Sequence, residues 1–123
     1  MTYYPPGMVY YNNHPSPTVL PPKEYRRSID LSPTNASNIS DLGNGFYLYR
    51  WGKQVFNPKE YSTVYLHPYD GHKVISAGYD SDSAAAPITF LSNYPLTTSI
   101  WSFWLVNTSS INANVSFHLI SKA

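Results

Sequence analysis

The stretch that decides the fold class lies near the end of the chain, where residues 113–121 read ANVSFHLIS. Three apolar side chains fall on one face of this stretch if it is extended: Val115, Phe117 and Leu119. The opposite face carries Ser116, His118 and Ile120. A period of two is typical of a strand that buries one face. The sequence therefore predicts a closing β-strand that contributes to an apolar core.

Five further strand segments precede this one. They cover residues 46–51, 61–67, 73–79, 88–91 and 99–106. Turn residues separate them, for example Gly43-Asn44-Gly45, Asn57-Pro58-Lys59-Glu60 and Pro68-Tyr69-Asp70-Gly71. Strands at spacings of about 10–15 residues, without a helical pattern between them, favour a sandwich or a small barrel. We expect an all-β fold, an antiparallel, jelly-roll-like β-sandwich of about six strands.

The composition agrees with a β domain and narrows the function. The chain has 123 residues, a net charge of +1, no cysteine, and twelve tyrosines, three tryptophans and five phenylalanines. Aromatic residues suit a pleated surface, and the length allows one domain with a tail. The balanced charge argues against nucleic-acid binding. No apolar run approaches the roughly 18 residues of a membrane span, and the first residues do not resemble a signal peptide.

Residues 1–40 differ from the rest, and we expect them to form an extended N-terminal anchoring arm, followed by the sandwich domain at 41–123. Seven of the eleven prolines lie there: Pro5, Pro6, Pro15, Pro17, Pro21, Pro22 and Pro33. Proline excludes regular helices and central strands, so extended polyproline-like chain is expected. A disordered tail is the alternative, but such tails are rich in charge and poor in aromatics. We expect four tyrosines to anchor the arm on a partner: Tyr3, Tyr4, Tyr10 and Tyr11.

The segment 100–106 has two apolar faces, one of which holds Trp101, Phe103 and Leu105. Because a small sandwich has a single core, one face needs another cover. We expect these three residues to form an oligomer interface; cover by loops or the arm within the same chain is the alternative. The central position of Trp104 in this run also predicts that its truncation destabilises the fold more than truncation of Trp51.

Two sequence motifs and the final strand follow one another in an order that resembles a known protein family. Residues 42–52 read LGNGFYLYRWG, and residues 103–109 read FWLVNTS, before the final strand that contains FHLI at 117–120. Over about residues 41–121 the chain resembles the C-terminal module of bacteriophage tail fibres. The resemblance implies a β-sandwich that assembles as a homotrimer and whose loops contact host surface sugars or proteins. The chain departs from that family in having an arm instead of a fibrous shaft, and in residues 56–60.

From the resemblance we expect a non-enzymatic virion protein, made in the host cytoplasm and displayed on the virion surface. It would be a short fibre, a tail or baseplate component, or a capsid decoration protein that binds other virion proteins through its arm. The alternative is a carbohydrate- or receptor-binding tip that contacts a host surface glycan. Six loop residues are candidate ligand contacts: Tyr69, Asp70, His72, Tyr79, Asp80 and Tyr94.

No cofactor, metal or catalytic group is expected. His67, Asp70 and His72 are metal-ligating types, but Pro-Tyr-Asp-Gly between the histidines is a turn signal and no third ligand is evident. His118 and the Asp80–Asp82 segment have similarly ordinary explanations, a half-exposed strand residue and a solvated loop. The Asn-X-Ser patterns, among them Asn107-Thr108-Ser109 and Asn114-Val115-Ser116, are interpreted as loop and cap residues. Arg26 and Arg27 either pair with acidic groups on a partner or form a solvated bend.

Overall fold

The computed structural model describes residues 26–81 and 88–123, which form eight strands. The strands are β1 (Arg26–Leu31), β2 (Asn38–Gly43), β3 (Phe46–Phe56), β4 (Tyr61–Leu66), β5 (Lys73–Ser81), β6 (Ile88–Thr97), β7 (Ile100–Asn107) and β8 (Ala113–Lys122). A single 3-10 helical turn, η2 (Pro33–Asn35), links β1 to β2. In this part of the chain no helix is long and apolar enough to cross a membrane.

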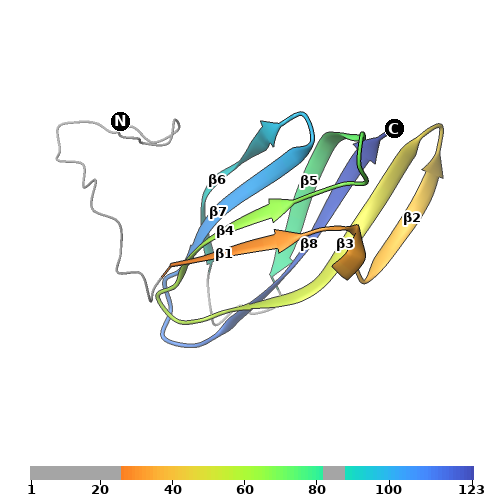
Figure 1. Cartoon of the computed structure of the whole chain (residues 1–123). Helices are drawn as coiled ribbons and strands as arrows, with labels where there is room; N and C mark the ends of the chain where they lie inside the picture. The colour runs from red at the N-terminus through yellow and green to blue at the C-terminus, as the bar shows by residue number, and fades with distance from the viewer. Residues whose placement is uncertain (1–25, 82–87) are drawn as a thin grey trace, which may run out of the picture.

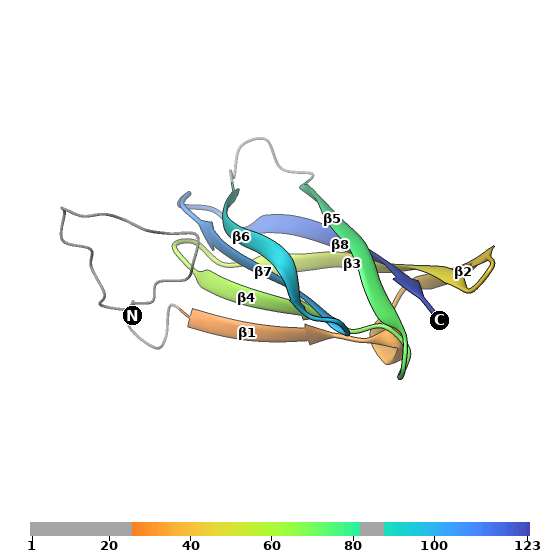
Figure 2. The same ribbon diagram turned by 90° about the horizontal axis from the view of Figure 1, so that it is seen from above.

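The strands form two four-stranded sheets that pack face to face (Figures 1 and 2). Sheet A has the order β1-β4-β7-β6, and sheet B has the order β2-β3-β8-β5. All pairings are antiparallel except β1 with β4, which is parallel. The expected all-β sandwich is confirmed, with eight strands in place of about six.

The sandwich begins earlier than the sequence patterns indicated. β1 and the first residues of β2 lie inside the segment 1–40 that we expected to be arm. The strand β1 was not predicted, because prolines lie on both sides of it in the sequence. Ile29 and Leu31 nevertheless alternate with Ser28 and Asp30, as a half-buried strand requires. Pro33 does not interrupt either strand, because it stands at the start of η2. Residues 1–25 of the expected arm lie outside the described residues.

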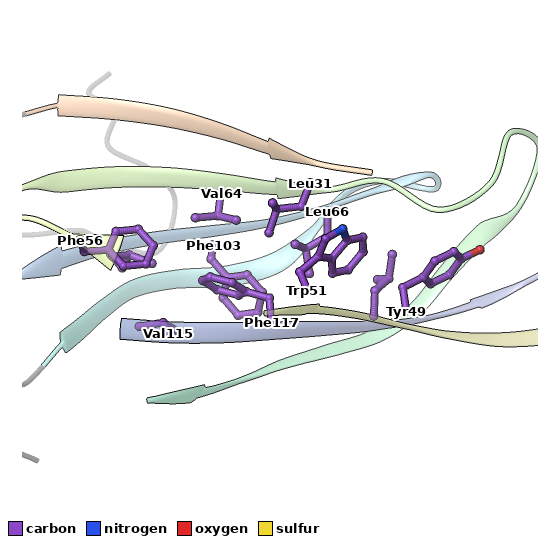
Figure 3. Packing of buried hydrophobic residues seen from close by; sticks show 11 residues of the cluster. Leu31, Tyr49, Trp51, Phe56, Val64, Leu66, Phe103, Val115 and Phe117 are labelled. Carbon is purple, nitrogen blue, oxygen red and sulfur yellow. The ribbon is translucent and has the colours of Figure 1, made fainter. Parts of the chain in front are cut away.

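The core lies between the two sheets and combines aromatic rings with leucine and valine side chains (Figure 3). Tyr49 and Trp51 on β3 stack with ring centroids 5.9 Å apart. Phe103 on β7 lies 5.2 Å from Phe117 on β8, which joins the two central strands across the sandwich. These four side chains are all at most 1% exposed. Burial of aromatic rings from both sheets is therefore what holds the layers together.

Trp51 also fixes the η2 turn. Its indole Nε1 donates to the Ser32 carbonyl oxygen at 2.9 Å and to Asn35 Oδ1 at 3.2 Å. Asn35 Oδ1 in turn accepts the backbone N–H of Ser32 at 2.8 Å. The expected solvent-accessible position of Trp51 is therefore wrong: the residue is a buried anchor between β3 and the β1–β2 connection.

The expectation for β7 is also corrected. Phe103 and Leu105 are 0% exposed in the core, so they cannot form a surface interface. Trp101 points the same way, packs against the core, and donates from Nε1 to Asn93 Oδ1 at 2.6 Å. The second apolar face of β7 is the outward one, and it carries Trp104 and Val106. Successive side chains of a strand point to opposite faces of its sheet. The face of β7 with Trp101, Phe103 and Leu105, which we assigned to a partner, is the one that sheet B covers.

Candidate interaction surfaces

The outer face of sheet A carries aromatic side chains on its three antiparallel strands. Tyr61 and Tyr65 on β4 alternate with the buried Ser62, Val64 and Leu66, so they point outward. Trp104 on β7 and Tyr94 on β6 lie on the same face because the register pairs them with outward residues. Among the described residues no element packs over this face (Figure 2).

The register arranges these residues in rows across sheet A. One row contains Tyr65, Ser102 and Tyr94, so a small residue on the central strand stands between two tyrosines. The next row places Thr63 opposite Trp104. Ser102 is only 5% exposed, because the two flanking rings cover it.

The polar groups of these rings are unpaired within the described part of the chain. The hydroxyls of Tyr61, Tyr65 and Tyr94 and the indole N–H of Trp104 form no hydrogen bond there. Tyr94 is 39% exposed, and the other three are half-buried. Half-buried tyrosine and tryptophan with free donors are the side chains that are enriched at protein interfaces.

The outer face of sheet B has a different character. One row across its four strands consists of Asn38, Arg50, His118 and Gly78. Arg50 and His118 are exposed. An antiparallel sheet commonly packs one face on the core and leaves the other in water. The next row on this face contains the half-buried aliphatic Leu48 and Ile120, so the outer face of sheet B mixes polar and aliphatic side chains. The outer face of sheet A instead presents tyrosine and tryptophan rings.

The β4–β5 connection forms a second candidate surface at one end of the sandwich. The backbone N–H of His72 donates to the Tyr69 carbonyl oxygen at 3.0 Å, which closes a turn with Gly71 at φ +83°. Tyr69 packs edge-on against Tyr47 and Tyr49, with centroids 5.7 and 5.5 Å away. The turn therefore presents Asp70 to solvent while its aromatic neighbours hold it on β3.

A buried polar network lies beneath this turn. The hydroxyls of Tyr49 and Ser121 share a hydrogen bond of 2.8 Å, and the Tyr49 hydroxyl accepts the Tyr69 N–H at 3.1 Å. His72 Nδ1 lies 3.2 Å from Ser121 Oγ. A serine beside a histidine is the contact that activates a nucleophile. Here Ser121 is 0% exposed, so a substrate cannot reach its hydroxyl, and the contact serves to satisfy buried polar groups.

A pocket of about 180 Å³ opens next to the turn. Its lining comes from residues 67–71 and from the β6–β7 hairpin at Ser99 and Ile100. Ligand pockets for drug-sized molecules occupy roughly 300–1,000 Å³, so this one admits only a small group. His67 at its rim is held by Asp30, whose Oδ1 lies 2.9 Å from His67 Nε2.

The six expected ligand contacts do not form one site. The structure brings Tyr69, Asp70 and His72 together in the β4–β5 connection. Tyr79 instead points toward the core side and stacks on Phe90 with centroids 3.8 Å apart. Asp80 lies on the outer face of sheet B and Tyr94 on that of sheet A. The anchoring tyrosines Tyr3, Tyr4, Tyr10 and Tyr11 lie outside the described residues.

Charged groups form few clusters in residues 26–81 and 88–123. No group of three metal-ligating side chains occurs in this part of the chain. Arg27 pairs with Glu60 at 3.2 Å and lies over the Phe56 ring, 5.3 Å from its centroid. Arg27 therefore ties β1 to the start of β4 within the chain. We had considered a contact with a partner or a solvated bend for this arginine.

Sequence reasoning missed the outward tyrosines Tyr61 and Tyr65, and placed the interface on the wrong side of β7. The signal was present in residues 61–66, which read YSTVYL and alternate between a ring or threonine and a smaller or aliphatic residue. Once Val64 and Leu66 are assigned to the core, the two tyrosines must face outward. The neighbouring Trp104 then follows from its pairing with Thr63.

Comparison with known proteins gives one result. No curated protein and no solved structure matches the chain. The YjdH family matches it over residues 27–121, a range that starts in β1 and ends in β8. The match therefore covers nearly the whole described sandwich, including the strand that we had expected to belong to the arm. The chain belongs to the YjdH family.

Proposed function

We propose that this chain is a non-enzymatic structural protein of a bacteriophage virion. It attaches to other virion proteins through its N-terminal segment and through the outer face of sheet A. The opposite side, formed by sheet B, faces solvent at the virion surface. The homotrimer implied by the resemblance to tail-fibre modules belongs to this proposal.

The observation that carries the proposal is the contrast between the two outer faces. Sheet A presents Tyr61, Tyr65, Tyr94 and Trp104, whose polar atoms have no partner among the described residues. The outer face of sheet B mixes Arg50 and His118 with the half-buried aliphatic Leu48 and Ile120, and in the described residues no tyrosine or tryptophan points outward there. Rings that are neither fully buried nor paired favour a surface that another protein covers.

The chemistry of the described residues also favours binding over catalysis. The Ser121–His72 contact is closed to solvent, and the 180 Å³ pocket contains no nucleophile next to a base. A general acid or base must reach its substrate within hydrogen-bond distance. An extended surface is therefore a better explanation of function than a reaction centre.

Deletion of residues 1–25 tests attachment. We expect the shortened protein to keep its sandwich, since all eight strands remain, but to be absent from purified particles assembled from a genome that carries the deletion. Circular dichroism of the isolated protein gives the control for folding. Normal incorporation of the folded deletion protein would contradict attachment through the N-terminal segment, and absence of the full-length protein from particles would contradict the virion role itself.

Carbohydrate recognition at the β4–β5 connection is the second candidate. It is favoured by the 40% exposed Tyr69 ring beside the exposed Asp70 carboxylate at the rim of the pocket. A ring and a carboxylate can together bind one sugar residue by stacking and hydrogen bonding. Glycan-array binding that Tyr69→Ala removes and Tyr94→Ala leaves intact would support this candidate. The same binding in both variants would place the sugar elsewhere.

A further inference from the structure

We propose that the outer face of sheet A binds the same face of a second copy of the chain, in a dimer whose twofold axis runs across the strands at Trp104. The inference concerns the isolated protein, uses only the described sandwich, and holds whether or not the protein belongs to a virion. A virion partner of sheet A would have to displace the second copy. A threefold contact elsewhere on the chain is compatible with this dimer, and the assembly then has an even number of copies.

The charged side chains of this face lie on its edge strand β1, on either side of a neutral residue. Arg26, Ser28 and Asp30 point outward, because the residues between them turn toward the core. Among the described residues Arg26 has no ion-pair partner. Asp30 contacts His67 through Oδ1 at 2.9 Å, and its second carboxylate oxygen can accept from another donor. A twofold axis at Ser28 brings Arg26 of each copy to Asp30 of the other.

The strand register continues this arrangement across the sheet in three rows. The outer two rows each contain a charged residue on β1, a tyrosine on β4, a residue of β7 that is at most 8% exposed, and a residue of β6. They are Arg26, Tyr61, Val106 and Thr89, and Asp30, Tyr65, Ser102 and Tyr94. The middle row is Ser28, Thr63, Trp104 and Ser92. An axis along the middle row therefore lays Tyr61 on Tyr65 of the other copy and brings the two Trp104 rings together.

Charge selects this axis and this face over the alternatives. An axis parallel to the strands lays β1 on β6, and β6 has no charged residue, so Arg26 and Asp30 would lose water without gaining an ion pair. On sheet B, an axis along the row of Arg50 and His118 places each Arg50 against the same residue of the other copy. Like charges in contact oppose association. The outer face of sheet A is therefore the self-complementary one.

The chemistry and the size of the face predict a weak dimer. Tyr65 and Trp104 are half-buried and have no hydrogen-bond partner for their polar groups among the described residues, and such rings are enriched at interfaces. Packed sheets lie about 10 Å apart, which leaves room for the rings of both copies. Six residues along β4 and four strands across give about 20 Å by 20 Å, on the order of 400 Å² per copy. Interfaces smaller than the usual ~800 Å² per partner are weak, so we expect a dissociation constant on the order of micromolar.

Sedimentation velocity of the full-length protein, at concentrations on both sides of that constant, tests the dimer. Arg26→Glu places two carboxylates in each contact and should weaken dimerisation at least about tenfold. Arg50→Glu makes the same charge change on sheet B and should leave dimerisation unaltered. A protein that stays monomeric at the highest concentration, an assembly with an odd number of copies, or equal weakening by both substitutions would overturn the proposal.

A second variant distinguishes a contact between copies from an effect on folding. Asp30→Arg alone should also be monomeric. An equimolar mixture of Arg26→Glu and Asp30→Arg should dimerise again, because opposite charges then meet in both contacts, and misfolding cannot produce that recovery. A mixture of folded variants, checked by circular dichroism, that stays monomeric would overturn the proposal. If Asp30→Arg does not fold, Trp104→Ala and His118→Ala compare the centres of the two faces. Loss of the dimer in the Trp104 variant alone is expected, and any other result contradicts the proposal.

Discussion

At the level of single residues, the three tryptophans occupy three environments: Trp51 and Trp101 point inward, at the centre and the rim of the core, and Trp104 points outward. Trp51 is 1% exposed and donates two hydrogen bonds to the β1–β2 connection. Trp101 is half-buried at the rim of the core, with its indole N–H on Asn93. Trp104 is half-buried on the outer face of sheet A. The same residue type therefore serves the core, the rim and the surface.

Replacement of each tryptophan by alanine should lower the free energy of unfolding most for Trp51, less for Trp101 and least for Trp104. Loss of a buried aromatic side chain costs about 3–5 kcal/mol, and here the carbonyl of Ser32 also loses its donor. Trp104→Ala removes a partly exposed ring and should cost less in the free energy of unfolding. Urea midpoints read at unchanged slope measure both. A larger loss for Trp104 would show that the outer face of sheet A is closed within the chain.

Asn107 shows how one side chain organises a loop. It is 0% exposed, and its Nδ2 donates to the carbonyl oxygens of Phe56 at 3.0 Å and of Ile111 at 2.8 Å. Its Oδ1 accepts from Ser109. Asn107 therefore clamps the β7–β8 loop from a buried position, which its interpretation as a loop or cap residue did not specify.

Asn107→Ala should destabilise the sandwich by about 2–4 kcal/mol, because the buried carbonyl oxygen of Phe56 and the part-buried one of Ile111 lose their donor. Asn114 is the matched control: it begins the same sequence pattern but is half-buried on the outer face of sheet B. Its replacement by alanine should change stability by no more than about 0.5 kcal/mol. Thermal unfolding followed by circular dichroism compares the two, and similar losses would refute the clamp.

At the level of elements, the β4–β5 turn depends on one backbone angle. Gly71 has φ +83°, and a Cβ added there would meet nothing within 4 Å. Gly52 has equal space and no positive φ. Gly71→Ala should therefore cost about 1–2 kcal/mol through backbone strain alone, whereas Gly52→Ala should be neutral or slightly stabilising. Chemical denaturation of both variants makes the comparison; no difference between them would mean that the turn relaxes freely.

β1 makes the largest difference between the expected and the observed fold. It contributes the buried Leu31, the Arg27–Glu60 ion pair, and the Asp30–His67 contact. Deletion of residues 1–33 should therefore unfold the protein or lower its stability severely, whereas deletion of residues 1–25 should not. Amide-signal dispersion in a proton–nitrogen spectrum distinguishes the two states. A well-folded protein without residues 1–33 would show that β1 is dispensable.

The sequence patterns predicted most strands because turn residues and alternation are local signals. Residues 113–121 and 46–51 were assigned to strands that the structure contains as parts of β8 and β3. β1 and β2 were missed because prolines nearby favoured extended chain, and because the parallel pairing of β1 with β4 joins residues about 35 positions apart. Pairing between such distant segments leaves no mark in a short sequence window.

At the level of the whole molecule, one outer face of the sandwich presents tyrosine and tryptophan rings, and the other mixes polar and aliphatic side chains. The patterns along β7 showed that two apolar faces exist, but not which of them the opposite sheet would cover. That choice depends on the packing of sheet B through Phe117 and Leu119 against Phe103 and Leu105. The candidate loop residues were likewise identified one by one, and only the folded chain shows that Tyr69 and His72 meet while Tyr79 and Tyr94 lie elsewhere.

The most direct test of the central claim compares the two outer faces in assembly. Tyr65→Ala with Trp104→Ala removes two rings from sheet A, and Leu48→Ala with Ile120→Ala removes two half-buried apolar side chains from sheet B. Quantitative mass spectrometry of purified particles measures how much of each folded double variant is incorporated. We predict strong loss of the sheet A variant and incorporation of the sheet B variant at the level of the unaltered protein. Equal incorporation of both would contradict the assignment of sheet A as the binding face.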